Sequence, residues 1–565
     1  MTKQQNNVIT GKPDQSLVWF FVILGGNQIM IITADGKKRE EVQQDLMPVR
    51  IIESNNIENV EGLMEFHPAC VSFKGFGWTG FRKPGSFVVL DFGKELCGGI
   101  RIVVRGVNGL AKWRVTFGES LTEAYSTIGV KNATNDHAPR DFEFVTSGMS
   151  DLKFGQTGFR FVRLELTEGE EVAVQNIYAV SYLPLFDREA EIKTNDELLN
   201  EIIQTAAYTL KLNFQNGYIW DGIKRDRLVW SGDLHPEILT SLYLFGDNDN
   251  IKNSLEFLKE STAEGAWINN IPSYSSWWVI NLCEYCAFTE NWEFFEENKA
   301  YALSIIERMD NCIAEDGTLE LTDGFGMEYF LDWSTHNSED AKVGVASQIR
   351  WMAQKFLAIE GNAHCKSIIN KLASWVDVKT TLKPVRAFQI IAGRNLGQED
   401  VEMLQKDGAQ GFSTFMAYYI LRAIAAAGGE ESLEILKTYY GSMLSRGATS
   451  FWEDFDMDWL ENSGRIDELP KEGQNDIHGD YGKYCYIKFR HSLCHGWASG
   501  VLSFIIEHIL GVNIQDGGKR VSVNPHLLGL TDIDATIPLK DGMLEISIHG
   551  DDIQIKAPET TVVER

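Results

Sequence analysis

The stretch TNDELLNEIIQTAAYTL, residues 194–210, decides how the chain divides, because the period of its apolar residues changes there from about two to 3.6. Thr194 and Glu197 have the spacing of a capping box at a helix start. The stretch therefore predicts a first helix and marks the border between a strand-rich part and a helical part. One face of this helix would carry Leu198, Leu199, Ile202, Ile203, Ala206, Ala207 and Leu210.

Upstream of this helix, short apolar strings alternate with turns that contain glycine. Strands at this spacing, without long helical patterns between them, are typical of a β-sandwich. We predict an N-terminal β-sandwich domain over residues 16–185, with the polar residues 120–140 as a long loop. The clearest strings are residues 87–92, 100–104, 113–117 and 159–166.

Downstream of the first helix, helical periodicity recurs, and some runs are apolar on two sides, as the inner helices of a barrel are. The total is about twelve helices, and six hairpins in a ring are the simplest closed arrangement of twelve. We predict an (α/α)6 barrel over residues 190–511, although periodicity alone does not exclude a solenoid. The later runs are residues 236–245, 250–261, 273–288, 292–314, 340–359, 363–376, 383–394, 398–405, 414–427, 431–443 and 492–509.

After Gly511 the helical pattern stops and short alternating strings return. They predict a C-terminal β-sandwich domain over residues 515–565. A unit of about 50 residues is too small to be stable alone, so we expect it to pack on the helical domain. Its predicted strands are residues 520–523, 533–538, 543–548 and 553–557.

Composition limits the class of partner. The formal net charge of −28 argues against nucleic acid and an anionic membrane, which need a basic surface, and it disfavours a polyanionic substrate. The apolar run at residues 18–24 is too short to span a bilayer, and no basic region precedes it. We expect a soluble, cytoplasmic protein that binds a neutral ligand. A homodimer is compatible with the sequence, which does not determine the oligomeric state.

The eight cysteines form neither a disulfide framework nor a zinc pattern. Cys283 and Cys286 form a CxxC, but it lies within an apolar helical run and no second pair is near. Two neighbouring core thiols explain this spacing better than metal or redox chemistry does. No metal site is predicted.

The segment YIWDGIKRDRLVWSGDLHPE, residues 218–237, is dense in acids, arginines and tryptophans. Such side chains are poor core material, because each buried charge must be paired. They suit a sugar, which offers hydroxyls to carboxylates and an apolar ring face to an indole. A solvated loop is the ordinary alternative, but such loops rarely need large aromatics. The residues are Trp220, Asp221, Arg225, Asp226, Arg227, Trp230, Asp233 and Glu237.

Acids and tryptophans recur in two further loops, GFGMEYFLDW at residues 324–333 and GATSFWEDFDMDW at residues 447–459. A polar insertion of about 30 residues follows the second loop, and loops of that length are usually functional or mobile. Because loops at one end of a helical ring converge, we predict one cleft in which two carboxyl groups hydrolyse a glycosidic bond. The candidates here are Glu328, Asp332, Trp333, Trp452, Glu453 and Asp454.

The combination DGIKRDRLVWSGD, GATSFWE and SLCHGWASG, in this order, resembles the bacterial α-L-rhamnosidase family of glycoside hydrolases. The segments LDFGKELCGGIRI and VNPHLLGL resemble parts of the family's N- and C-terminal β-domains, and the resemblance covers about residues 84–557. It implies a β-sandwich, an (α/α)6 barrel and a C-terminal β-sandwich. It also implies an inverting hydrolase that cleaves terminal α-L-rhamnose without a cofactor.

The resemblance assigns roles to individual residues. Glu453 matches the general base that activates water. Asp221 and Asp233 match acids that hold sugar hydroxyls, Trp333 resembles a tryptophan of the sugar pocket, and His495 resembles a polar residue near the sugar, although a structural histidine is the ordinary reading of His495 alone. The predicted substrate-binding set is completed by Arg225, Trp230, Asp332 and Trp452.

The general acid is where this chain departs from the family. The pattern commonly has a glutamate seven residues before the acid matched to Asp233, whereas here Asp226 is one methylene shorter. Neighbouring arginines lower a carboxyl pKa, which opposes the raised pKa that suits a general acid. We therefore expect Arg225 or Arg227 to bind another acid, such as Asp221 or Asp233.

Two other functions stay open. One is a different (α/α)6 carbohydrate enzyme, such as another glycosidase or a lyase, although a lyase needs a tyrosine or histidine base and basic residues for a uronate. The other is a catalytically silent sugar-binding protein that lost the acid at Asp226. The sequence does not determine linkage or aglycone.

Overall fold

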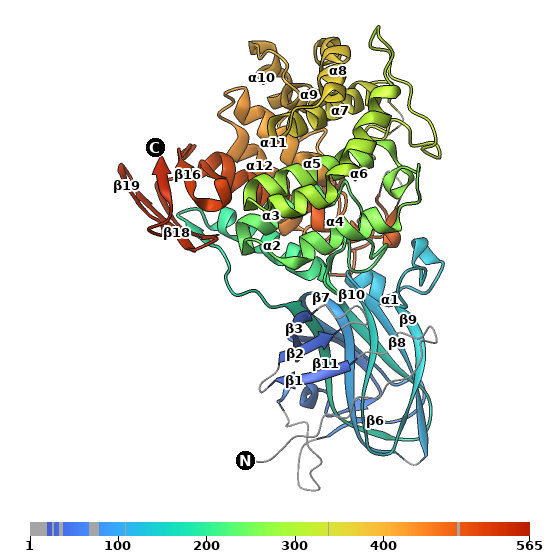
Figure 1. Cartoon of the computed structure of the whole chain (residues 1–565). Coiled ribbons are helices and arrows are strands. Elements are labelled where there is room, and N and C mark those ends of the chain that lie inside the picture. Colours follow the sequence, from blue (N-terminus) through green and yellow to red (C-terminus); the bar gives the residue numbers. More distant parts are fainter. Residues whose placement is uncertain are drawn as a thin grey trace, which may run out of the picture.

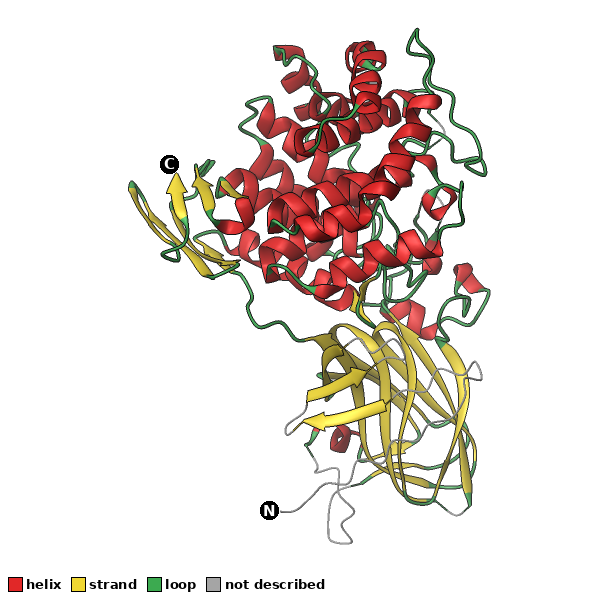
Figure 2. Ribbon diagram, in the orientation of Figure 1, coloured by secondary structure: helices red, strands yellow, loops and turns green. Residues whose placement is uncertain are grey.

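The computed structural model describes residues 20–24, 28–32, 38–66, 78–107, 109–336, 338–482 and 486–564. An antiparallel β-domain comes first, a helical barrel follows, and two small sheets complete the chain, which confirms the predicted fold class (Figures 1 and 2). The start of the predicted sandwich, residues 16–19, lies outside the described residues.

The N-terminal domain is built on two long strands, β7 (Phe87–Gly106) and β10 (Ser150–Glu168), which pair antiparallel. The strings at 87–92 and 100–104, predicted as separate strands, are one strand, and register shifts near Phe154 and Phe159 of β10 interrupt the pairing. The main sheet has the order β1-β2-β3-β11-β7-β10-β8-β9. The other strands are β1 (Phe20–Leu24), β2 (Gln28–Ile32), β3 (Lys38–Leu46), β4 (Arg50–Asn55), β5 (Ile57–Glu58), β6 (Thr79–Phe81), β8 (Leu110–Gly118), β9 (Asp141–Ser147) and β11 (Val172–Pro184).

The period-two pattern of this domain fills its core. Trp113, Val115 and Phe117 on β8 are fully buried, whereas Lys112 and Arg114, which alternate with the first two of them, are partly exposed. The Phe81 ring packs edge-on against Trp113 at a centroid distance of 4.9 Å. Alternation along the strand therefore sets which face of the sheet is apolar.

The polar segment 120–140, predicted as a loop, contains helix α1 (Leu121–Tyr125) and the 3₁₀ turn η2 (Val130–Asn132). Ser120 caps α1 by accepting a hydrogen bond from Glu123 N at 3.2 Å. Leu121 N donates to Ile466 O at 2.8 Å, so this segment contacts a loop of the helical domain. The N-terminal domain therefore reaches the loop end of the barrel.

Six helices form a closed inner ring, in which each contacts the next and the last contacts the first. Closure of the ring confirms the barrel and excludes the solenoid. The inner helices are α3 (Leu234–Phe245), α5 (Pro272–Thr289), α7 (Ala341–Ile359), α9 (Lys383–Ile391), α11 (Thr414–Ala426) and α13 (Gly500–Phe504), which continues as a π-helical turn, Ile505–Ile509.

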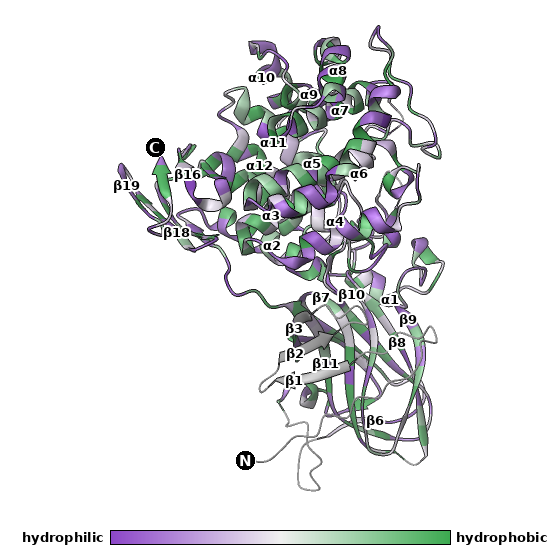
Figure 3. Ribbon diagram, viewed as in Figure 1, coloured by the Kyte–Doolittle hydropathy of each residue, from purple (hydrophilic) through white to green (hydrophobic). Residues whose placement is uncertain are grey.

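Six further helices alternate with the inner ones along the chain. Each buries one stripe: in α4, the buried residues Ile251, Ser254, Leu255 and Leu258 recur at helical spacing, and hydrophilic residues cover much of its outer side (Figure 3). The outer helices are α2 (Glu197–Asn213), α4 (Asp249–Ser261), α6 (Trp292–Asn311), α8 (Ala363–Lys371), α10 (Gln398–Gln405) and α12 (Ser432–Ser445).

The predicted capping box of α2 is wrong. Asp196 is the N-cap, and its carboxylate accepts a hydrogen bond from Leu199 N at 2.9 Å. Thr194 instead ends strand β12 (Glu191–Thr194), and its hydroxyl donates to Asn200 Oδ1 at 3.1 Å. The strand holds Thr194 in extended backbone and leaves Asp196 as the first side chain free to cap.

Two small sheets form the C-terminal region, with orders β12-β17-β18-β19 and β15-β16-β20. Strand β12, which precedes the barrel in sequence, is an edge strand of the first sheet, so both ends of the barrel segment meet there. Ile533, Ile537 and Leu544 belong to the same buried cluster as the barrel core, which confirms the predicted packing. The strands are β15 (Val512–Gln515), β16 (Arg520–Val523), β17 (Asp532–Leu539), β18 (Gly542–His549), β19 (Asp552–Lys556) and β20 (Val562–Glu564).

Cys283 and Cys286 are buried in α5 as free thiols, in agreement with the core interpretation of the CxxC. Burial raises the pKa of both thiols. None of the helices in the described part of the chain has the length and apolar character needed to cross a membrane.

Candidate active site

Two of the singled-out segments pair directly with each other. Gly222, after β14 (Tyr218–Ile219), forms an antiparallel bridge with His495, and Gly496 N donates to Asp221 O at 2.7 Å. The short hairpin of β13 (Phe214–Gln215) and β14 starts this loop, and α3 ends it. The segments 218–237 and 491–500 therefore share one end of the barrel.

Arg225 joins the predicted acid and base. Its buried guanidinium has Nη1 at 2.9 Å from Asp226 Oδ1, and Nη2 donates to Glu453 Oε1. Its Nε donates to Arg490 O at 3.0 Å. The Tyr486 ring stacks on the guanidinium, with its centroid 3.1 Å from Cζ. The expectation that an arginine binds another acid is confirmed, but the acid is Glu453 and not Asp221 or Asp233.

Arg227 points away from the acids. Its Nη1 donates to Gln156 O at 3.3 Å, and its guanidinium lies over the Trp220 ring at 4.8 Å. It therefore ties the loop to the N-terminal domain.

Glu453 is held as a carboxylate. Burial opposes ionisation, but the charge and hydrogen bond of Arg225 outweigh it and lower the pKa of Glu453. Ser492 N also donates to Glu453 Oε2 at 3.0 Å. Burial lowers the pKa of His495 itself to about 3, so this imidazole is neutral at pH 7. The other titratable neighbours of Glu453 are Asp233 and Asp454.

Asp226 lies in left-handed backbone, with φ of 54°, and Arg227 follows with φ of 56°. Two such residues in a row are uncommon without glycine and are tolerated where surroundings fix them. The Asp226 carboxyl accepts from Tyr486 OH at 3.2 and 3.3 Å, and His137 Nδ1 lies 3.4 Å from Oδ1. His137 comes from the N-terminal domain, which therefore contributes to the site.

Asp221, Asp233 and Glu237 form a buried acidic group beside these residues. Burial, and then repulsion from neighbouring carboxylates, raises the pKa of each well above its usual range. His495 Nε2 lies 3.7 Å from Asp221 Oδ2 and 3.9 Å from Asp233 Oδ1, and Tyr274 OH donates to Asp233 Oδ2 at 3.3 Å. Burial therefore favours the protonated form of these three acids.

A cavity of about 20 Å³ lies next to Glu453. That is room for about one water, whereas ligand pockets usually measure roughly 300–1,000 Å³. A sugar therefore enters only if the lining side chains move. The lining residues are Asp332, Trp333, Ser413, Glu453, Asp454, Tyr486 and Trp497.

Only some of the tryptophans and acids that were predicted to bind the substrate line this cavity. Trp333 and Asp332 line it, and Asp332 Oδ2 accepts from Ser413 Oγ at 2.7 Å. Trp452 is fully buried and packs edge-on against Phe455 at 5.7 Å, so its indole belongs to the core. Trp230 packs against Tyr274 at 6.0 Å and does not line the cavity either.

Several residues of the site were missed in the sequence. Trp497 follows His495 within the HGW motif, so the motif itself was a signal. Tyr486 lies in the long polar insertion whose length suggested function. His137 carried no signal, because it lies in a polar segment of another domain.

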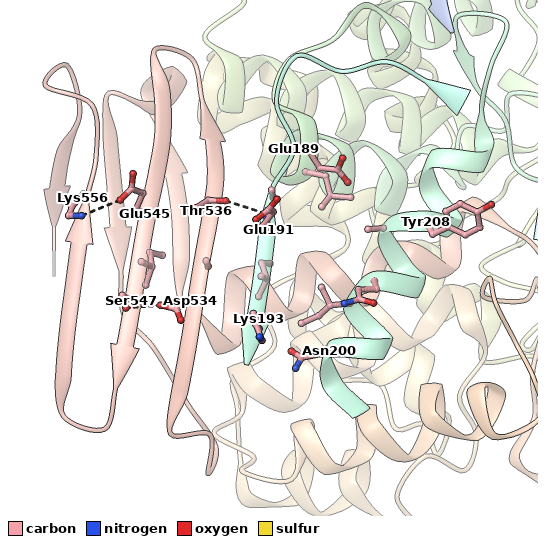
Figure 4. A pocket seen from close by; sticks show the side chains of 18 of the residues that line it. Glu189, Glu191, Lys193, Asn200, Tyr208, Asp534, Thr536, Glu545, Ser547 and Lys556 are labelled. Carbon is pink, nitrogen blue, oxygen red and sulfur yellow. Dashed lines mark hydrogen bonds and ion pairs between the residues drawn. The ribbon is translucent and has the colours of Figure 1, made fainter. Parts of the chain in front are cut away.

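The largest groove near the C-terminal sheets, of about 970 Å³, lies between β12, α2 and strands β17 to β19 (Figure 4). Two ion pairs lie along it: Lys556 Nζ is 3.4 Å from Glu545 Oε2, and Lys211 ion-pairs with Glu189. None of the acids and tryptophans singled out in the sequence lines it. Candidate acids and tryptophans therefore line the small cavity and not this groove.

Two family descriptions match the chain. Residues 187–298 match the bacterial alpha-L-rhamnosidase 6 hairpin glycosidase domain, and residues 81–182 match the bacterial alpha-L-rhamnosidase concanavalin-like domain. A search of the curated proteins finds no match.

Solved structures of rhamnosidases share the fold. The GH78 family rhamnosidase of Bacillus sp. GL1 has a TM-score of 0.67 at 19% identity, over 85% of this chain and 52% of its own. The rhamnosidase from Klebsiella oxytoca with rhamnose bound has a TM-score of 0.64 at 18% identity, over 83% and 96%. The Streptomyces avermitilis α-L-rhamnosidase complexed with L-rhamnose has a TM-score of 0.67 at 15% identity, over 93% and 50%.

This chain thus spans about half the length of the Bacillus and Streptomyces proteins and nearly all of the Klebsiella protein. At these identities the likeness establishes the fold. The chain thus carries two domains that match models of the bacterial alpha-L-rhamnosidase family, and its fold is that of solved rhamnosidase structures.

Proposed function

We propose that this protein is a glycoside hydrolase that removes terminal α-L-rhamnose from glycosides or oligosaccharides with inversion, and that residues 190–511 are its catalytic domain. The observation that carries the proposal is the shared contact of Arg225 with Asp226 and Glu453. It joins carboxyl groups from two loops beside a cavity with room for about one water. An acid and a base on opposite sides of the bond are what inverting hydrolysis needs.

In this proposal Glu453 is the general base. Its lowered pKa supports the role, because a base must be deprotonated before it accepts a proton from water. Its second carboxylate oxygen accepts from Ser492 N, which fixes the direction of the group.

Asp226 is the proposed general acid, which protonates the departing oxygen. Its contacts with Tyr486 and His137 support a fixed position. Asp233 is the alternative acid, because burial raises its pKa and so favours the protonated form that a general acid needs. Otherwise Asp221 and Asp233 hold sugar hydroxyls, as His495, Asp332 and Trp333 would from the other loops.

The proposal that the sugar is rhamnose rests on the similar rhamnosidase structures. Two of the similar structures hold rhamnose, and an apolar wall such as Trp333 suits a 6-deoxy sugar, whose methyl group makes no hydrogen bond. The net charge of −28 supports a neutral substrate, and the six free cysteines of the described residues support action in the cytoplasm.

The test is hydrolysis of a panel of aryl glycosides, with proton NMR of the first product. Release from the α-L-rhamnoside, with the product appearing first as the inverted anomer, is the expected result. Release from another sugar alone would move the protein to a different specificity, and a retained anomer would exclude Glu453 as a base. If no glycoside is cleaved but free rhamnose raises the melting temperature, the protein binds sugar without catalysis.

A further inference from the structure

Lys224, two residues before the proposed acid, is a buried lysine that the proposed reaction does not use. Its Nζ donates to His491 O at 2.6 Å and Phe489 O at 2.9 Å. Glu119 Oε2 lies at 3.0 Å and Glu123 Oε1 at 3.3 Å. An ammonium has three protons, so two carbonyls and one carboxylate satisfy it and the second carboxylate adds charge.

The two acids belong to the N-terminal domain. Glu119 follows β8, and Glu123 lies in α1; both are fully buried. Glu123 Oε2 accepts from Glu119 N at 2.9 Å, which joins them into one unit. Charges this deep are retained only when paired, so Lys224 and the acids depend on each other.

Glu119 also reaches the barrel directly. Its Oε2 accepts from Leu493 N at 2.5 Å, and its Oε1 accepts from Ser492 Oγ at 3.1 Å. Lys224 and Glu119 therefore both bind the segment 489–493. Lys224 donates to two of its backbone carbonyls, and Glu119 accepts from a backbone amide and a hydroxyl of it.

The same segment holds the proposed base. Ser492 N donates to Glu453 Oε2 at 3.0 Å, and Arg490 O accepts from the Nε of Arg225 at 3.0 Å. His491 Nε2 accepts from Asp454 N at 2.9 Å. A displacement of this segment would therefore displace both Glu453 and its guanidinium partner.

Glu119, Glu123 and His478 also have the spacing of a metal site, with ligand atoms within 4.8 Å of one another. The Lys224 Nζ lies within 3.5 Å of all three. His478 Nε2 donates its proton to His491 O at 2.9 Å, and Nδ1 accepts from Ser120 Oγ at 2.7 Å, so both ring nitrogens already have hydrogen-bond partners. The ammonium is thus the cation of this cluster.

We propose that Lys224 is a positioning residue: its ammonium binds Glu119 and Glu123 of the N-terminal β-domain to the segment 489–493 and so fixes the proposed base Glu453. The N-terminal domain thereby contributes to the geometry of the reaction. This inference rests on the proposed function.

The test replaces Lys224 by methionine, which keeps the length of the side chain and removes its charge. With an aryl α-L-rhamnoside, the kcat of Lys224→Met should fall about 10–10²-fold while KM changes little, since misplaced groups slow the chemical step. The acidic limb of kcat/KM should move to higher pH, because Glu453 loses the Ser492 N–H that helps lower its pKa. A lower melting temperature with an unchanged kcat and an unmoved limb would overturn the proposal.

Lys131→Met is the matched control. Lys131 links the same two parts of the chain, with Nζ at 2.7 Å from Asp480 Oδ1, but it is 38% exposed, and its contact with the segment 489–493 is the Phe489 ring, whose centroid lies 5.8 Å from Nζ, and not the backbone that Lys224 binds. It should leave kcat and the pH profile unchanged. If it lowers kcat as much as Lys224→Met does, a general loosening of the domains explains both, and the proposal fails.

If Lys224→Met does not fold, Glu119→Gln takes its place, because the amide keeps the shape and removes one charge. It should lower kcat and move the same limb, and a folded Glu119→Gln with neither change would overturn the proposal.

Amide hydrogen exchange separates this inference from the proposed function. If the wild-type protein cleaves no glycoside, the proposed function is wrong, but hydrogen exchange still measures whether Lys224 holds the segment 489–493 in place. Faster exchange of the Ser492 and Leu493 amides in Lys224→Met than in Lys131→Met supports the link. Equal exchange in the two variants would overturn it.

Discussion

A single guanidinium, that of Arg225, holds both carboxyl groups on which the proposed reaction depends. Its charge keeps Glu453 ionised, and its contact with Asp226 must be exchanged for substrate if Asp226 is to donate a proton. The neighbouring Asp221 and Asp233 are buried without such a partner and carry raised pKa values. Environment, and not residue type, thus separates Glu453, whose pKa is lowered, from Asp221 and Asp233, whose pKa values are raised.

The first prediction follows from the need of the leaving group for a proton. A nitrophenolate leaves without help, whereas a sugar alcohol does not. Asp226→Asn should therefore keep much of its activity on a nitrophenyl rhamnoside and lose about 10²–10⁴-fold on a disaccharide. Glu453→Gln should lose activity on both substrates, because each needs an activated water. Steady-state kcat/KM values on the two substrates measure the difference.

Asp233→Asn is the control for that assignment. If Asp233 only holds hydroxyls, its loss lowers kcat/KM on both substrates alike. If Asp233→Asn shows the leaving-group dependence and Asp226→Asn does not, the general acid is Asp233.

The second prediction concerns pH. The base must be deprotonated, so kcat/KM falls as pH drops through the pKa of Glu453, which Arg225 keeps low against the effect of burial. Arg225→Gln removes that charge and should move the acidic limb upward by about 1–3 pH units, the usual effect of a contacting opposite charge. Arg227→Gln, which removes a guanidinium that binds Gln156 O instead, should leave the limb in place. An unmoved limb in a folded Arg225→Gln would contradict this account.

At the scale of elements, the loops between the barrel helices hold the candidate site residues, and the helices fix where these loops begin and end. The segment after β14 crosses the barrel end in left-handed and bridged backbone before α3 begins. The shift of the α2 cap from Thr194 to Asp196 has the same origin, because β12 pairs with β17 and holds Thr194 extended. Tertiary pairing therefore overrides a local signal.

The third prediction tests that cap. Asp196→Ala should lower the free energy of unfolding by about 0.5–2 kcal/mol, because Leu199 N loses its acceptor. The ion pair with Lys437, at 2.7 Å, is part-exposed and adds little. Thermal unfolding measures the change. Glu197→Gln, at an exposed acid that does not cap, should have no effect, and an equal loss there would restore the predicted capping box.

At the scale of the whole molecule, each of the three parts of the chain contains side chains or a strand that belong to the structure of another part. The N-terminal domain supplies His137 and Glu119 to the barrel loops, and β12 from before the barrel completes a C-terminal sheet. A barrel cut at the predicted boundaries would lack these contacts. We therefore propose residues 16–185, 190–511 and 515–565 as three structural units that depend on one another for these contacts.

The fourth prediction follows for the C-terminal region. Removal of residues 512–565 leaves β12 without its partner strand and uncovers apolar surface of the barrel, so the truncated protein should melt at lower temperature and aggregate. Calorimetry and sedimentation measure both effects. Removal of β20 alone, which pairs only with β16, is the milder control. An unchanged melting temperature after the full truncation would show that the region is independent.

The sequence by itself determined the fold class, the helices of the barrel and four of the strands near the C-terminus, but not β15 and β20, because apolar periodicity is a local property that burial enforces in each element. It also identified the loops that carry the acids. Trp452 and Trp230 show its limit: a tryptophan beside an acid lines a cavity or fills a core according to its surroundings, and the structure places Trp452 in the core.

Only the tertiary structure decided which side chains meet. Arg225 and Glu453 are 228 positions apart, and Glu119 and Leu493 are 374 apart. Contacts at such separations depend on how loops leave the barrel and how the N-terminal domain docks, and no local pattern encodes either. The sequence therefore shows which residue types the candidate site contains. Which of these side chains contact one another, and with that the lowered pKa of Glu453, depends on the folded chain.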